Sequence, residues 1–213
     1  MNLLEQISLD LQAGEDDNVA RLTQQAIDSG LTPQRILDDG LLAGMAVVGN
    51  KFKVHEIFLP DVLLAARAMY CGLDILKPHL VKEAVLSRGK IVLGTVQGDL
   101  HDIGKNLVGI MLKGAGFEVI DLGNDVSPEK FVDTAIEEKA PIIGLSALLT
   151  TTMPMMKNVV ELVRGRGLQD RIKVIVGGAP VSDAWARQIG ADAYGYDAAS
   201  AVERVRALAR KPA

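Results

Sequence analysis

The sequence predicts two parts, a bundle of four helices followed by a Rossmann-like (flavodoxin-like) α/β domain with a doubly wound, five-stranded parallel sheet. Up to about residue 80, apolar residues recur at helical spacing between short breaks. From residue 90 onward, short apolar runs alternate with segments of helix length. Charged residues with proline and glycine punctuation at 77–89 indicate a linker, so we place the two domains at 1–86 and 87–213.

Four helices are expected before the linker. Gly14 and Gly30 end the first two, because glycine favours the residue after a helix. Thr32–Pro33 starts the third, since a hydroxyl cap followed by proline is a strong helix entry, and this helix runs towards Phe52. Pro60 begins the fourth. Helices joined by such short loops form a small bundle.

The second part begins with a strand at Lys90–Gln97, a continuous β-prone run typical of a central strand buried on both faces. The following helix begins near Lys105, and another is opened by Ser127–Pro128. Further strands are expected at 117–122, 141–146, 172–177 and 191–195, with helices near 152–166, 182–189 and 198–209. This alternation predicts a parallel sheet of order 2-1-3-4-5.

The composition excludes several classes of protein. In 213 residues, 48% are hydrophobic and only 4% aromatic, which describes an aliphatic core. A net charge of -4 gives no general basis for binding nucleic acid. We find neither a secretory signal pattern nor an apolar stretch of roughly 20 residues, the length that spans a membrane. The single Cys71 cannot form an intramolecular disulfide, so we expect a cytoplasmic protein.

His101 lies in the expected loop between the first strand and its helix, at the edge where open α/β sheets bind ligands. A self-contained zinc or iron site needs three or four ligands, yet no Cys and no second His follows residue 80. A metal bound by His101 would therefore arrive already held, as a macrocycle holds the iron in haem. Asp99 could accept the proton of one ring nitrogen and leave the other free. A solvated loop histidine is the alternative reading of these residues.

Three motifs follow successive strands in order: Gly98–Asn106, Ser146–Thr152 and Gly177–Pro180. Together they resemble the cobalamin-binding module of methionine synthase. They are still more similar to the small corrinoid proteins of methylamine, methanol and methoxyl methyltransferase systems. The resemblance covers nearly the whole chain.

The resemblance implies that cobalamin binds in the base-off/His-on form, with His101 as the lower axial ligand of cobalt. Asp99 and Thr152 would manage the linked proton, although methionine synthase has a serine where this chain has Thr152. The nucleotide tail would lie in a slot near Ser146 and pass close to the backbone at Gly177–Gly178. The implied cofactor-binding residues in this domain are Gly98, Asp99, His101, Asp102, Ile103, Gly104, Ser146, Leu148, Thr150, Thr152, Gly177 and Gly178.

The helical part resembles the cap of methionine synthase in residues 44–52 and 56–60. In that cap an apolar pair covers the upper face of the corrin, and the matching residues are Phe52 and Leu59. The alternative is that both are ordinary core residues at a helix–loop–helix corner.

The resemblance implies a corrinoid methyl carrier, a subunit rather than a complete enzyme. It would take a methyl group from a donor-specific methyltransferase and pass it to a second one acting on a thiol or tetrahydrofolate. A reductive activase is a further candidate partner, whereas nucleic acid and membrane are not expected.

Three alternatives stay open. A cobalamin-dependent regulator should bring a helix-turn-helix and a basic face. A radical mutase subunit shares Asp-x-His-x-x-Gly but normally lacks the helical cap. A flavodoxin-like or receiver domain fits the fold alone, yet a receiver needs a phosphorylatable Asp where this chain has Ser146.

Overall fold

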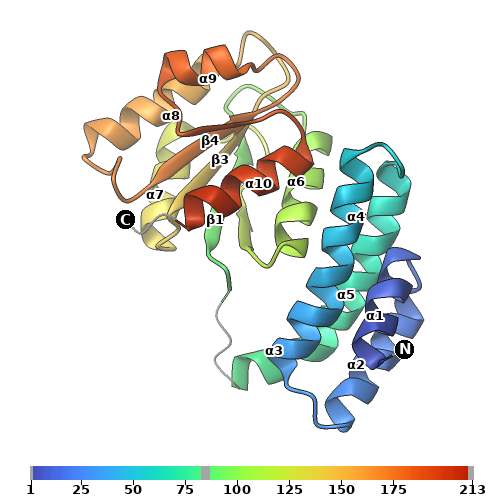
Figure 1. The fold of residues 1–213 in the computed structure, drawn as a ribbon. Helices are drawn as coiled ribbons and strands as arrows, with labels where there is room; N and C mark the ends of the chain where they lie inside the picture. Colours follow the sequence, from blue (N-terminus) through green and yellow to red (C-terminus); the bar gives the residue numbers. More distant parts are fainter. Residues whose placement is uncertain (1, 83–86, 211–213) are drawn as a thin grey trace. The chain divides into compact units, whose positions relative to one another are not determined.

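The computed structural model describes residues 2–82 and 87–210, which divide into two compact units (Figure 1). The first unit contains the helices up to α5, and the second contains the sheet with the helices from α6 onward. Among these residues, none of the helices has the combination of length and apolar character needed to span a membrane.

The helical unit has four helical segments, as predicted. Thr32 caps the third segment through its hydroxyl, which accepts from the Arg35 N–H at 3.4 Å, and Pro33 follows at the first helical position. The buried side chains include Ile7, Leu11 and Met69. The segments are α1 (Leu3–Gln12), α2 (Asp16–Asp28), the continuous run α3 (Pro33–Arg35), η1 (Ile36–Leu42) and α4 (Ala43–Lys53), and α5 (Leu59–Lys82).

Two features of this unit differ from the prediction. The third segment contains a π-helical stretch, η1, where Gly40 packs against α1 so closely that an added Cβ would lie 3.2 Å from Ile7 Cγ2. The fourth helix runs from Leu59 to Lys82, with Pro78 and a half-buried His79 inside it. The predicted linker at 77–89 is therefore wrong in its first part, because the helix continues to Lys82 and keeps His79 and Leu80 half-buried. Residues 83–86 lie outside the described residues.

The second unit is a five-stranded parallel sheet with the predicted order β2-β1-β3-β4-β5 (Figure 1). The strands are β1 (Lys90–Thr95), β2 (Glu118–Asp121), β3 (Ile142–Ser146), β4 (Lys173–Gly177) and β5 (Ala193–Gly195). One helix follows each strand in turn: α6 (Ile103–Gly114), α7 (Pro128–Glu137), α8 (Pro154–Gly165), α9 (Asp183–Ile189) and α10 (Ala198–Ala209). As predicted, Ser127 caps α7 by accepting from the Lys130 N–H at 3.3 Å.

The strand register sets the position of the loops. Strands β1 and β3 are buried on both faces, which explains their unbroken apolar runs. Thr95 pairs with Ser146, and Ser146 pairs with Gly177, so β1, β3 and β4 end at the same level. The loops that follow these three strands therefore start side by side at one edge of the sheet.

Candidate functional site

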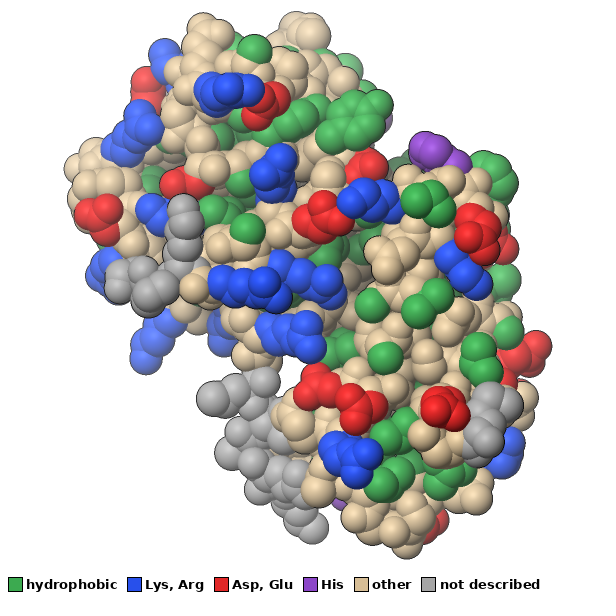
Figure 2. All heavy atoms as spheres, viewed as in Figure 1, with side chains coloured by type: hydrophobic (Ala, Val, Ile, Leu, Met, Phe, Trp, Pro, Cys, Tyr) green, Lys and Arg blue, Asp and Glu red, His purple; other side chains and the backbone are tan. Residues whose placement is uncertain are grey.

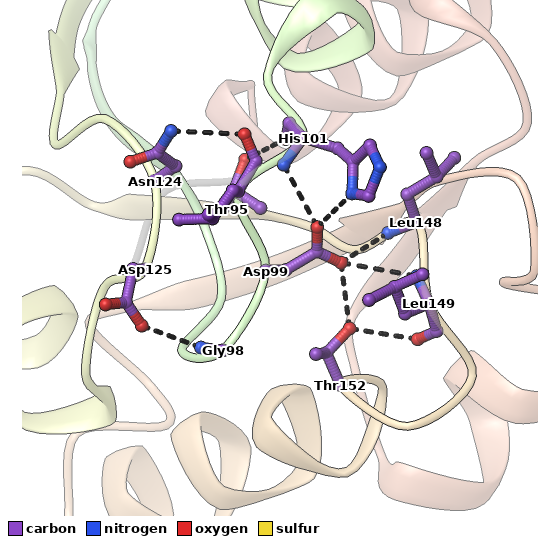
Figure 3. Close-up of polar contacts among 10 residues, drawn as sticks. Thr95, Gly98, Asp99, His101, Asn124, Asp125, Leu148, Leu149 and Thr152 are labelled. Atoms are coloured by element: carbon purple, nitrogen blue, oxygen red, sulfur yellow. Dashed lines mark hydrogen bonds and ion pairs between the residues drawn. The ribbon is translucent and has the colours of Figure 1, made fainter.

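The β1–α6 loop carries a hydrogen-bonded pair, Asp99 and His101, at this edge (Figure 3). Asp99 Oδ1 lies 2.7 Å from His101 Nδ1 and also accepts from the His101 backbone N–H at 3.1 Å. The Asp99 side chain is fully buried, while 53% of the His101 side chain is exposed. Because Asp99 engages Nδ1, the ring nitrogen left for a metal is Nε2.

The β3–α8 loop holds the second oxygen of the Asp99 carboxylate. Asp99 Oδ2 accepts from the Leu148 N–H at 2.8 Å, the Leu149 N–H at 3.2 Å and the Thr152 hydroxyl at 2.8 Å (Figure 3). Burial raises the pKa of Asp99, but the hydrogen bonds from Leu148, His101 and Thr152 outweigh it and hold that pKa well below its usual range. The carboxylate is therefore ionised at neutral pH.

Thr152 stands where the sequence predicted it, within reach of Asp99. Its hydroxyl also lies 2.9 Å from the Leu149 carbonyl oxygen, although it has a single proton to donate. The structure thus joins His101, Asp99 and Thr152 in one hydrogen-bonded chain, and their functional roles stay predictions.

We call the β1–α6 loop, residues 96–102, the histidine loop. A third loop, β2–α7, contacts it from the side opposite Thr152 (Figure 3). Asn124 Nδ2 donates to the Leu100 carbonyl oxygen at 3.1 Å, and Asp125 Oδ1 accepts from the Gly98 N–H at 2.7 Å. Sequence reasoning missed both residues. The available signal was an Asn-Asp pair after the second strand, because both types favour turns with left-handed backbone.

The start of α6 offers an open, apolar surface next to His101. Leu100 is 70% exposed and Ile103 is 75% exposed. A Cβ added at Gly104 would meet nothing within 4 Å. Asp102 precedes the helix, where its carbonyl oxygen accepts from the Asn106 N–H at 2.7 Å. Nothing in the fold of this unit requires glycine at position 104.

The glycines after β4 have a different basis. A Cβ added at Gly178, whose φ is +132°, would overlap the Ala147 carbonyl oxygen, and one at Gly177 would lie 2.9 Å from the Gly195 carbonyl oxygen. Close approach of the chain to itself therefore already requires both glycines. Their predicted role beside the nucleotide tail stays a prediction.

The remaining residues predicted around the tail lie on the β3–α8 side. Ser146 is half-buried at the end of β3, and its carbonyl oxygen accepts from the Val96 N–H at 3.0 Å. Leu148 and Thr150 are exposed.

Family models identify the relatives of this chain. Two family models, each described as a B12 binding domain, match residues 3–77 and 89–205 of this chain. The chain belongs to the B12-binding family. It is 48% identical over 206 residues to a corrinoid protein of Desulfitobacterium hafniense, covering 95% of each chain. It is 43% identical to trimethylamine corrinoid protein 1 of Methanosarcina acetivorans, covering 91% of each chain.

Solved structures of B12-binding proteins share this fold. One is the methanol:cobalamin methyltransferase complex MtaBC of Methanosarcina barkeri, with a TM-score of 0.88 at 33% identity over 99% of this chain and 80% of that one. Another is a cobalamin-binding protein of Desulfitobacterium hafniense, with a TM-score of 0.80 at 32% identity over 98% of each chain. The resemblance and fold class predicted from the motifs are confirmed.

The residues of this B12-binding protein fit a corrinoid that brings its own metal. Within residues 2–82 and 87–210, no group of three or more His, Cys, Asp or Glu side chains is arranged to hold a metal ion. A metal already held by a macrocycle needs only one ligand from the protein, and an oriented imidazole beside an open, apolar surface can supply it.

In the helical unit, Phe52 lies near the end of α4 and Leu59 is the first residue of α5. Both are half-buried, whereas Val54 and Phe58 between them are each 67% exposed. The predicted pair therefore belongs to a partly exposed apolar corner, in which Phe58 is an additional aromatic residue.

Proposed function

We propose that this protein is a methyl carrier that binds cobalamin base-off, with His101 as the lower axial ligand. It receives a methyl group from a donor-specific methyltransferase and delivers it to a second methyltransferase that acts on a thiol or tetrahydrofolate. A reductive activase is proposed as the partner that restores the cofactor. Relatives named for trimethylamine and dimethylamine, and a similar structure named for methanol, support this assignment.

The observation that carries the proposal is the 2.7 Å contact between Asp99 and His101 Nδ1, combined with a half-exposed ring at the carboxyl edge of the sheet. When bound, the corrinoid supplies a cobalt centre that accepts and releases a methyl group. Asp99 fixes the tautomer, because a proton held at Nδ1 leaves the lone pair of His101 on Nε2. Thr152 and the Leu148 N–H hold the carboxylate in the orientation that this requires.

The ligand assignment is tested by electron paramagnetic resonance of the protein reconstituted with Co(II) cobalamin. Wild type should show hyperfine coupling to a protein nitrogen, and His101→Ala should lose it. The chain has three histidines, so His55→Gly is a matched control that should keep the coupling. Coupling that persists in His101→Ala would contradict the assignment.

The methyl-carrier role is tested on protein loaded with methylcobalamin and mixed with the candidate acceptor methyltransferase. Loss of the methylcobalamin absorption spectrum should require that enzyme together with a thiol or with tetrahydrofolate. His101→Ala should slow this transfer. A spectrum that stays unchanged with both acceptors would argue for a regulator or mutase subunit instead.

We propose further that Phe52 and Leu59 cover the methyl side of the corrinoid. The support is that both belong to a corner whose apolar side chains remain partly exposed to water. Phe52→Ala combined with Leu59→Ala should leave cofactor binding largely intact and speed photolysis of the methyl–cobalt bond. If this double variant lost cofactor while the remainder photolysed at the wild-type rate, the pair would be a structural support.

A further inference from the structure

The histidine loop is held from two sides, and only one of them involves the Asp99 side chain. On the other side the β2–α7 loop binds its backbone (Figure 3). Asp125 accepts from the Gly98 N–H at 2.7 Å and donates its own N–H to the Asp99 carbonyl oxygen at 3.0 Å. Asn124 donates to the Leu100 carbonyl oxygen at 3.1 Å. Three consecutive residues before His101 are therefore fixed from this loop.

Asp125 adopts a conformation in which glycine would be less strained. Its φ is +54°, in the left-handed region that side chains with a Cβ disfavour, although Asp tolerates it better than most. A glycine here would keep the backbone bond to Asp99 and lose the bond from Gly98. The carboxylate is thus the part of Asp125 that holds the Gly98 N–H.

The β2–α7 loop is itself firmly anchored. Lys105 is only 3% exposed, and its Nζ lies 2.6 Å from both carboxylate oxygens of Asp121. Asp121 Oδ1 in turn accepts from the Gly123 N–H at 2.9 Å, and the Gly123 carbonyl oxygen accepts from the Thr95 N–H at 2.9 Å. The loop is therefore tied both to α6 and to the end of β1, and it provides a rigid support for the histidine loop.

The direction of the imidazole depends on this backbone. Asp99 Oδ1 binds both the backbone N–H and the ring of His101, so a shift of residues 98–101 moves the ring relative to the carboxylate. The backbone of His101 is also held directly, because its carbonyl oxygen accepts from the Thr95 hydroxyl at 2.8 Å. Groups that orient a metal ligand typically change affinity about 10-fold to 100-fold when they are removed.

We propose that Asp125 and Asn124 are positioning residues for His101, fixing the backbone so that Nε2 points at the metal. This inference rests on the proposed function, in which His101 is the lower ligand of cobalt.

The test compares Asp125→Gly, Asp125→Asn and Asn124→Ala, each reconstituted with Co(II) cobalamin. Asp125→Gly should lower the population with nitrogen hyperfine coupling, corresponding to about a 10-fold weaker histidine bond. Asp125→Asn should restore most of it, because the amide oxygen can still accept from the Gly98 N–H. Asn124→Ala should have a smaller effect in the same direction. Lys139→Gly, at another left-handed residue (φ +54°) on the far end of α7, is the control and should match wild type in its nitrogen coupling.

A second readout uses the protein without cofactor. In ¹⁵N-labelled protein, Asp125→Gly should broaden the His101 Nδ1–H signal while the thermal midpoint stays near that of wild type. Wild-type nitrogen coupling in Asp125→Gly would overturn the positioning role, provided that His101→Ala abolishes the coupling. If His101→Ala retained the coupling, the proposed function itself would fail.

Discussion

At the scale of single residues, Asp99 links the site to the stability of the fold. Its carboxylate is fully buried and has a pKa held well below the usual range of an aspartate. Because the folded pKa is depressed, the stabilisation is present above pH 3.8 and is lost as pH falls towards the folded pKa. In that window the unfolded chain binds a proton that the native protein excludes.

Asp99→Asn should therefore be less stable than wild type at pH 7, by about 1–3 kcal/mol, since an amide leaves some of these donors unpaired. The difference should shrink as pH falls below about 4. Urea unfolding at pH 7, 4 and 3 checks this. A difference that stays constant over that range would show that ionisation of Asp99 does not stabilise the fold.

Gly104 gives a prediction in which stability and binding change in opposite directions. Alanine is favoured over glycine inside a helix by about 1 kcal/mol, and an added Cβ at position 104 meets nothing within 4 Å. Gly104→Ala should raise the thermal midpoint of the cofactor-free protein and weaken cobalamin binding. Calorimetry and an absorbance titration check the two effects, and unchanged affinity would show that the cofactor does not pass close to Gly104.

The sequence was most informative about residues that act through their own side chains. Asp99 and His101 were identifiable from their spacing and residue types, whereas Thr152 was identified only through the resemblance to methionine synthase. Asn124 and Asp125 were not, because they act on the backbone of another loop. Only the parallel register of β1 and β2 brings those two loops together.

At the scale of secondary structure elements, α7 and α8 end with the same backbone geometry. Lys139 follows α7 with a φ of +54°, and Gly167 follows α8 with a φ of +67°. In both cases the backbone N–H of the next residue donates to a carbonyl oxygen of the last helical turns. The Ala140 N–H donates to the Ala135 carbonyl oxygen at 2.8 Å, and the Leu168 N–H donates to the Val163 carbonyl oxygen at 2.9 Å.

Lys139→Gly should raise the free energy of unfolding by about 0.5–1 kcal/mol, because it removes left-handed strain. Gly167→Ala should lower it by a similar amount, because its added Cβ meets no neighbour within 4 Å and only the backbone is strained. Chemical denaturation measures both. Equal effects of the same sign would contradict this explanation.

Helix boundaries were predictable where caps and glycines mark them, as at Thr32, Ser127 and Gly14. The π-helical stretch η1 was not, because its apolar residues Ile36, Leu41 and Leu42 also fit a regular helix. In this stretch Gly40 packs against Ile7, a contact between segments far apart in the chain.

At the scale of the whole molecule, charge is unevenly distributed. Figure 2 shows Lys and Arg side chains gathered on the face of the α/β unit near α10. Burial lowers the pKa of Arg206 on this helix, and the positive charges of Arg88 and Arg210 lower it further, against a smaller opposing effect of Glu203. Its buried Nε has no hydrogen-bond partner.

Arg206→Met should stabilise the protein, because it keeps the apolar stem and removes a repelled charge. The gain should stay below about 1 kcal/mol, since the group is partly exposed, and should decrease with added salt. Thermal unfolding at low and high ionic strength checks this. A variant less stable than wild type at low salt would show that the guanidinium contributes a net attraction.

The two acceptors of the Thr152 hydroxyl, Asp99 Oδ2 at 2.8 Å and Leu149 O at 2.9 Å, also bear on the timing of events at this site. If Asp99 takes up a proton, Thr152 can accept from it and turn its own proton towards Leu149, and no heavy atom has to move. Side-chain rotations of this size take picoseconds to nanoseconds, whereas domain motions take microseconds to milliseconds. The Thr152 hydroxyl can therefore follow a change of protonation at Asp99 far faster than any domain motion.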